Sequence, residues 1–242
     1  MVGRTLAVMA ATAAFAVGAA PAFAQQIQPG QGMESEAGNC TLNWIYDGTG
    51  AQAGKVYAGT AAHCVSGVGA QVNLAEDPFG DPLERIGTVA FRGDADEPGR
   101  DYAFIEIDAE DLGQVNPALK GHPSIPTGVS RGYGQGDLMQ FSGYGVGFHL
   151  IQPTRERRVG VLNWTDGLQH DILGAVTPGD SGGPVGNLSD GNTAFGIVDT
   201  VGYGIRPGAL SPASVVEGGT NLEFVLRDAA AHGFNVALRT VG

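Results

Sequence analysis

Glycine and proline content limits what this chain can fold into. The 242 residues include 40 glycines and 13 prolines. Within a helix, glycine costs about 1 kcal/mol and proline about 3 kcal/mol relative to alanine. A mainly helical fold is therefore disfavoured, whereas short strands joined by many turns fit this composition. The chain is also long enough to bury a sizeable core.

Strand-like apolar runs fall into two sets of five along the chain. The first set lies at 42–46, 55–59, 71–74, 84–91 and 102–107, and the second at 138–142, 157–162, 170–173, 184–185 and 194–199. Between the sets, residues 115–126 contain three prolines and no sustained periodicity, which favours a domain boundary there. We expect an N-terminal unit over 39–120, a C-terminal unit over 121–242, and a flexible leader over 25–38.

One helix is predicted near the carboxyl end. Residues 220–223 read Thr-Asn-Leu-Glu, the pattern of a capping box, and Gly233 is placed to end the helix. Apolar residues recur at helical spacing in this stretch and should pack against the C-terminal unit: Leu222, Val225, Leu226 and Ala229.

The amino terminus has the pattern of an export signal over residues 1–24. Arg4 gives a short positive region, residues 6–20 are apolar, and residues 22–24 read Ala-Phe-Ala, a small-residue cleavage site. A spanning helix is the alternative, but it needs about 20 apolar residues. We therefore expect a secreted chain, extracellular or periplasmic, that begins at Gln25 and makes no membrane contact after cleavage.

The expected export places the two cysteines in an oxidising compartment, where disulfides form. Cys40 and Cys64 are the only cysteines, and an even pair in a secreted chain favours a disulfide over a reduced buried pair. In the chain-entropy model, closing this loop contributes roughly 3 kcal/mol. The bond would hold the segment around His63 against the preceding strand.

Three short motifs bring together an imidazole, a carboxylate and a hydroxyl. Residues 60–64 read Thr-Ala-Ala-His-Cys, Asp101 precedes an apolar run, and residues 178–184 read Pro-Gly-Asp-Ser-Gly-Gly-Pro. A serine hydroxyl needs a base such as His63 to attack a carbonyl, and Asp101 would orient the imidazole. The glycines would let the N–H groups of Gly179 and Ser181 form an oxyanion hole. This chemistry is acyl transfer through a serine nucleophile.

In their order and spacing, these motifs resemble those of the chymotrypsin-like (trypsin-fold) serine peptidases. The chain is similar to the secreted bacterial streptogrisin-like branch of this family also in its segments Cys40-Thr41-Leu42 and Gly218-Gly219-Thr220. The resemblance spans about residues 38–236, although only the motifs match the family's sequences closely. It implies an all-β fold of two antiparallel six-stranded barrels with the catalytic cleft between them and a C-terminal helix. It also implies a serine endopeptidase that acts on protein or peptide substrates.

The chain departs from this family around Asp180. No Arg or Lys precedes an Ile-Val-Gly-Gly-like sequence, so a newly cut N-terminus has no obvious way to pair with Asp180. Bacterial relatives can use an arginine from a Gln-Arg-Ser-Gly segment, but here Phe141 occupies that position. The sequence patterns therefore name no partner for Asp180.

The resemblance also suggests where the substrate side chain binds. Ala175 would form the pocket base, and Val198, Asp199 and Thr200 would belong to its far wall. Without an acidic residue at Ala175 or a histidine at Val198, a small or apolar residue is expected on the acyl side of the cleaved bond. Asp199 keeps a basic preference open.

Charge disfavours polyanionic partners. After removal of the signal, 12 basic side chains stand against 25 acidic ones, a net charge of −13, which repels nucleic acid and anionic lipid. Arg155, Arg157 and Arg158 are interpreted as a solvated strand or hairpin face. No cofactor or metal is expected, and a monomer is the default. The alternative to an enzyme is a peptidase-fold protein with little turnover that uses its cleft as a binding surface.

Overall fold

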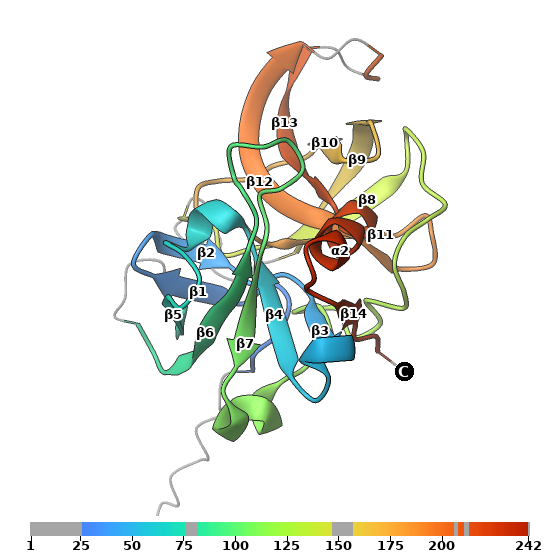
Figure 1. Cartoon of the computed structure of the whole chain (residues 1–242). Helices are drawn as coiled ribbons and strands as arrows, with labels where there is room; N and C mark the ends of the chain where they lie inside the picture. Colours follow the sequence, from blue (N-terminus) through green and yellow to red (C-terminus); the bar gives the residue numbers. More distant parts are fainter. Residues whose placement is uncertain (1–25, 76–81, 147–156, 206–207, 211–212, 242) are drawn as a thin grey trace, which may run out of the picture.

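The computed structural model describes residues 26–75, 82–146, 157–205, 208–210 and 213–241. It contains two antiparallel β units and an α-helix, α2 (Leu222–Ala231), near the carboxyl end (Figure 1). The predicted all-β fold with a C-terminal helix is confirmed. The predicted signal peptide lies outside the described residues.

The first unit is an eight-stranded sheet in the order β14-β3-β4-β7-β6-β5-β1-β2. It curls back on itself, because Asn43 N–H, which follows β2, donates to the Gly59 carbonyl on β4 at 2.7 Å. The family resemblance implies six strands for this unit, whereas the structure has eight. The strands are β1 (Gly32–Ser35), β2 (Gly38–Thr41), β3 (Ile45–Gly48), β4 (Val56–Thr60), β5 (Gln71–Ala75), β6 (Arg85–Arg92), β7 (Ala103–Ile107) and β14 (Val236–Leu238).

Two of these strands lie outside the region predicted for the first unit. β1 pairs with β2 and β5, and it lies in the segment expected to be a flexible leader. Ile27 and Met33 in that segment are fully buried, so the leader prediction is corrected for residues 26–38. β14 pairs with β3, so the end of the chain returns to the first sheet. Both strands are short, and the pairing of β1 with β5 and of β14 with β3 joins distant parts of the sequence, which local patterns do not report.

The second unit is a closed barrel of six antiparallel strands. Its last strand was not predicted, because its sequence contains two glycines that weaken a strand pattern. Gly219 is needed there, since an added Cβ would lie 2.0 Å from the Ile197 carbonyl oxygen. The strands are β8 (Leu138–Ser142), β9 (Arg157–Thr165), β10 (Gln169–Leu173), β11 (Pro184–Asn187), β12 (Thr193–Ile205) and β13 (Ala213–Asn221).

The helix α2 packs where the two units meet (Figure 1). Its buried face joins a cluster that includes aromatic rings of the first sheet and apolar side chains of the second barrel, so it contacts more than the second barrel alone. Members of this cluster are Trp44, Tyr46, Tyr57, Tyr102, Phe104, Ile197, Leu222, Val225 and Ala229. The helix therefore ties the two units together.

The start of α2 differs from the predicted capping box. Asn221 is the N-cap residue and makes no side-chain capping hydrogen bond. The Thr220 hydroxyl instead donates to the Asp199 carboxylate at 2.5 Å. A tertiary partner has thus replaced the local one. The other end is as predicted, with Gly233 at φ +81° after the last turn.

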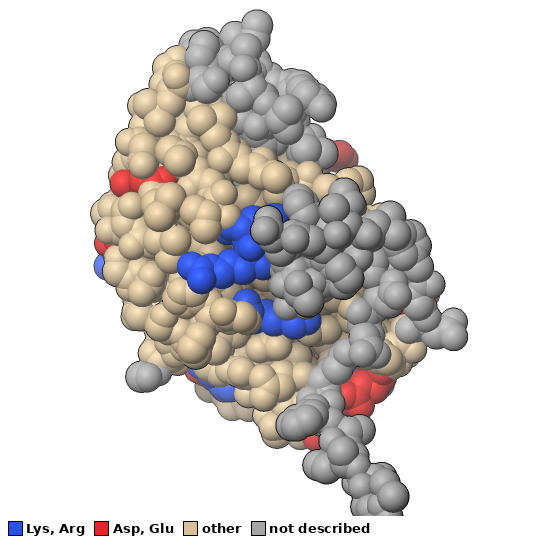
Figure 2. Space-filling model, turned by 180° about the vertical axis from the view of Figure 1, so that it is seen from behind, with Lys and Arg blue, Asp and Glu red and all other residues tan. Residues whose placement is uncertain are grey.

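On the rear face, most of the visible basic side chains gather near the centre (Figure 2). Among the residues that the structure describes, no helix is both long enough and apolar enough to cross a bilayer.

Candidate active site

His63 and Asp101 are in contact at one end of the first sheet, beside the paired inner strands β4 and β7. His63 lies in a 3₁₀ turn, η2 (Ala62–Cys64), directly after β4, and Asp101 lies just before β7. His63 Nδ1 is 2.6 Å from Asp101 Oδ2, and the His63 backbone N–H donates to Asp101 Oδ1 at 2.9 Å. The carboxylate thus holds both the ring and the backbone of His63. With Nδ1 facing Asp101, Nε2 is left for another partner.

Arg92 supports the turn that carries His63, and no local pattern marks it for this role. Arg92 Nε, on β6, donates to the Ala62 carbonyl at 2.9 Å and to the Val65 carbonyl at 3.2 Å. Ala62 is the first residue of η2, where its carbonyl also accepts the Val65 N–H at 3.3 Å, and Val65 directly follows the turn. Arg92 therefore fixes the backbone on either side of His63.

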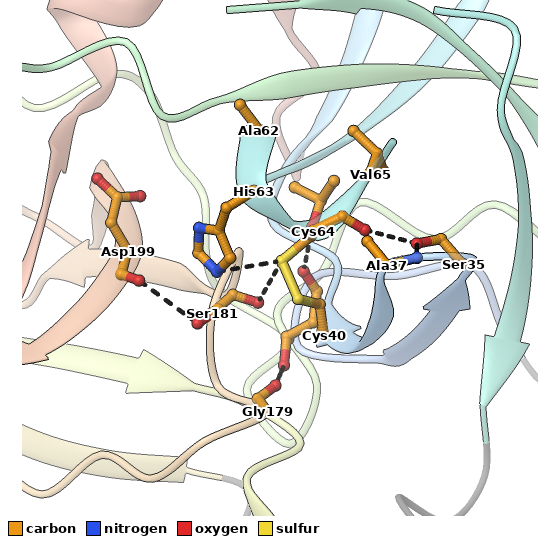
Figure 3. The surroundings of a disulfide bond; sticks show 12 residues. Ser35, Ala37, Cys40, Ala62, His63, Cys64, Val65, Gly179, Ser181 and Asp199 are labelled. Atoms are coloured by element: carbon orange, nitrogen blue, oxygen red, sulfur yellow. Dashed lines mark hydrogen bonds between the residues drawn. A yellow bond between two sulfur atoms is a disulfide. The ribbon is translucent and has the colours of Figure 1, made fainter. Parts of the chain in front are cut away.

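Cys40 and Cys64 form a disulfide, as predicted. Both sulfurs are committed to this bond, so the cluster of Cys40, His63 and Cys64 offers no thiolate to a metal. Cys64 Sγ lies 3.7 Å from His63 Nε2 and 3.7 Å from the Ser181 carbonyl oxygen (Figure 3). The imidazole and the backbone of Ser181 are therefore neighbours across the junction of the two units.

Ser181 lies in the glycine-rich turn between β10 and β11. Gly179 and Gly182 have φ values of +100° and +84°, which glycine adopts without strain. The Ser181 hydroxyl donates to the Asp199 carbonyl at 3.4 Å, a long hydrogen bond (Figure 3). In the part of the chain that the structure describes, no acceptor is found for the N–H of Gly179 or of Ser181.

Asp180 pairs with Arg158, which answers the question that the sequence left open. Arg158 Nη1 and Nη2 donate to the two Asp180 carboxylate oxygens at 2.6 Å each, and the two residues are only 8% and 1% exposed. Arg158 on β9 is the cross-strand partner of Phe141 on β8. The family resemblance would place an arginine on β8, at the position of Phe141, whereas here the arginine lies on the neighbouring strand β9. The expectation that Arg158 lies on a solvated face is wrong, whereas Arg157 is exposed.

The four residues predicted to form the substrate pocket are only partly together. Asp199 and Thr200 line a pocket of about 240 Å³ beside Asp101, which Glu97 and Gly99 also line. Ala175 is exposed and Val198 is buried in the barrel core, and neither lines this pocket. The Asp199 carboxylate, which is 6% exposed, accepts the Thr220 hydroxyl.

A further network fixes the backbone next to Asp101. On α2, Asp228 accepts the Tyr102 hydroxyl at 2.5 Å and Arg100 Nε at 3.1 Å. Tyr102 is fully buried, and its burial together with the Asp228 hydrogen bond raises its pKa well above the usual range. The helix thus holds both residues that flank Asp101. This network was not predicted, because nothing local in the sequence marks Asp228 as a partner of Tyr102.

We expect Asp228→Ala to lower the free energy of unfolding by about 1–3 kcal/mol, because it leaves the buried Tyr102 hydroxyl without its acceptor. Thermal unfolding followed by circular dichroism measures this. Glu97→Ala is the control, since Glu97 pairs with the same Arg100 at 2.7 Å but is 57% exposed. An exposed pair contributes at most about 1 kcal/mol. Equal losses for the two variants would contradict the assigned role of Asp228.

Comparison with known proteins fits this geometry. Thermobifida fusca protease A superimposes with a TM-score of 0.58 and 20% identity over 89% of this chain and 99% of that one. The chain has the chymotrypsin fold. This fold is shared with a glutamic acid-specific serine protease (TM-score 0.56, 18% identity, 88% and 100% covered). It is also shared with the alpha-lytic protease homologue N4 (TM-score 0.51, 20% identity, 89% and 100% covered).

At the level of sequence, no protein-family model and no curated protein is significantly similar to the chain. The resemblance inferred from the three motifs is therefore confirmed as a resemblance of fold. In this chymotrypsin fold, the residues of the three motifs lie at the junction of the first sheet and the second barrel.

Proposed function

We propose that the protein is a serine endopeptidase whose catalytic residues are His63, Asp101 and Ser181. The observation that carries the proposal is the orientation of His63. Its Nδ1 lies 2.6 Å from the Asp101 carboxylate, and its Nε2 is on the side of the disulfide where Ser181 lies. A base held by a carboxylate beside a serine in a glycine-rich turn is the arrangement that acyl transfer requires.

In the first half of the reaction, Ser181 Oγ attacks the carbonyl carbon of the scissile peptide bond. His63 Nε2 takes the hydroxyl proton, and Asp101 stabilises the imidazolium that forms. The carbonyl oxygen becomes an oxyanion that accepts the N–H groups of Gly179 and Ser181, which have no acceptor among the described residues. The carbon–nitrogen bond then breaks, and the leaving amine takes the proton from His63.

In the second half, water replaces the amine. His63 removes a proton from a water molecule while the water oxygen attacks the acyl carbon. His63 then passes this proton to Ser181 Oγ as the ester bond breaks. The free hydroxyl and the product acid result, so the enzyme is regenerated without a cofactor. The long hydrogen bond from Ser181 to Asp199 at 3.4 Å is weak enough to be exchanged for one to His63 when substrate binds.

The preferred substrate is a protein or peptide with a small or apolar residue on the acyl side of the cleaved bond. Ala175, which the family resemblance places at the pocket base, is not acidic and is exposed, and this supports the preference. The alternative, a basic preference, depends on Asp199, which lines the pocket beside Asp101 and whose buried carboxylate accepts the Thr220 hydroxyl. The signal pattern over residues 1–24 supports action outside the cytoplasm.

One observation favours the second candidate function, a cleft that binds peptides with little turnover. The Ser181 hydroxyl donates to the Asp199 carbonyl rather than to His63. If that arrangement persists with substrate bound, the hydroxyl stays without its base. Covalent labelling separates the two functions, because only an activated serine reacts.

We expect a fluorophosphonate probe to label the folded protein at Ser181, and the labelling rate to rise with pH. The imidazole must be neutral to accept the serine proton, and histidine side chains lose their proton between about pH 5 and 8. The rate is measured by in-gel fluorescence from pH 5 to 9, with the site identified by peptide mass spectrometry. Absence of labelling would favour the binding function, and a flat pH profile would contradict His63 as the base.

A further inference from the structure

Thr41, the last residue of β2, contacts the glycine-rich turn of the second barrel at several points. Its N–H donates to the Ser181 carbonyl at 2.8 Å, and its hydroxyl donates to the Gly179 carbonyl at 2.7 Å. The same hydroxyl accepts the N–H of Tyr144 at 2.9 Å. Thr41 is fully buried and lies next to Cys40 of the disulfide. One side chain of the first sheet therefore holds two segments of the second barrel.

Gly179 lies between two peptide groups whose carbonyls are both held. The peptide that carries the Gly179 N–H also carries the Pro178 carbonyl, which accepts the N–H of Val146 at 2.9 Å. The carbonyl on the other side of Gly179 is the one that accepts the Thr41 hydroxyl. Because each peptide group is planar, holding both carbonyls restricts both backbone torsions of Gly179.

Such a restraint matters most at a glycine. Gly179 has a φ of +100°, and a residue without Cβ can leave this conformation more easily than any other. An added Cβ would lie 2.9 Å from the Tyr144 carbonyl oxygen, so a stiffer residue cannot replace Gly179 without a shift of the backbone. The turn must therefore be held from outside, and Thr41 is the side chain placed to do so.

We infer that Thr41 is a positioning residue for the oxyanion hole. Its hydroxyl holds the Gly179 carbonyl and thereby keeps the Gly179 N–H directed at the oxygen where negative charge develops. This inference rests on the proposed function. Thr41 acts through Gly179 and does not contact the substrate. Because the oxyanion exists only after attack, losing the restraint lowers kcat more than it changes KM.

The test is Thr41→Val, which removes the hydroxyl and keeps the branched shape. We expect the rate constant for fluorophosphonate labelling to fall at least about tenfold, a part of what loss of a whole oxyanion donor costs. On a peptide substrate, kcat should fall by the same factor while KM stays within about twofold. Thr41→Ser keeps the hydroxyl and should label within about threefold of the unaltered protein.

Thr165→Val is the matched control. The Thr165 hydroxyl also donates to a backbone carbonyl, that of Gln169 at 2.7 Å, and accepts a backbone N–H, that of Gly167 at 3.1 Å. It lies in the β9–β10 hairpin and also accepts Asn221 Nδ2 at 2.9 Å, so its hydrogen-bond partners lie outside the turn of Ser181. We expect Thr165→Val to lower the melting temperature while leaving the labelling rate unchanged.

The outcomes separate the inference from the proposed function. If the unaltered protein is not labelled, the endopeptidase proposal fails. If it is labelled and Thr41→Val is labelled equally fast, the role of Thr41 is overturned. Should the valine variant not fold, Thr41→Ala, measured at least ten degrees below its own melting temperature, takes its place with the same expected loss and the same overturning result.

Discussion

Ser181→Ala is expected to reduce kcat on peptide substrates by at least about 10⁴-fold, because no other group in the proposed mechanism can form the acyl-enzyme. The fold should be unaffected. The Ser181 hydroxyl makes one long hydrogen bond, to the Asp199 carbonyl at 3.4 Å, and the residue is only partly buried. The measurement is cleavage of a fluorogenic peptide chosen by profiling cuts in a denatured proteome digest.

Non-additivity provides the sharper version of this test. His63→Ala alone should cost a similar factor in kcat, and the double variant should be little worse than either single one, because serine and base act as a unit. Melting temperatures of all three variants serve as the control for folding. If Ser181→Ala retained most of the activity, or if the two losses multiplied, the assigned nucleophile and base would be wrong.

Arg158→Met is expected to lower the free energy of unfolding by about 3–5 kcal/mol, because it leaves the Asp180 carboxylate buried without its counter-ion. Asp180 is only 1% exposed. Among the described residues, its remaining donors are the N–H groups of Gly145 and Thr177, at 2.9 Å and 2.7 Å. Activity should fall with stability, since Asp180 lies between Gly179 and Ser181 in the proposed oxyanion turn. Urea unfolding and fluorophosphonate labelling measure the two effects.

Two further variants isolate the buried charge as the cause. Arg157→Met alters the exposed neighbouring arginine and should change stability by no more than about 0.5 kcal/mol. Arg158→Met combined with Asp180→Asn removes both charges, so it should recover part of the stability lost in Arg158→Met alone. If the double variant were less stable than the single one, the loss would come from packing, and the pairing of Arg158 with Asp180 would not explain it.

Local patterns predicted those features that depend on neighbours in the sequence. The strand β8 has the predicted bounds, and α2 ends at Ala231, just before the predicted stop at Gly233. The disulfide was predictable because the chain has only two cysteines. The capping box was wrong for a physical reason, because the Thr220 hydroxyl finds a better-placed acceptor in Asp199. The roles of His63, Asp101 and Ser181 were predicted from their motifs and stay a proposal.

By itself, the sequence determined the all-β class, the disulfide and the three motifs that resemble a known family. Only the tertiary structure decided which side chains support them. Arg158 reaches Asp180 from β9, and Asp228 reaches Tyr102 from the C-terminal helix α2. Thr41 meets Gly179 across 138 residues of sequence. Such partners are chosen by proximity in the folded chain and by the cost of leaving a buried polar group without one, and no local pattern encodes either.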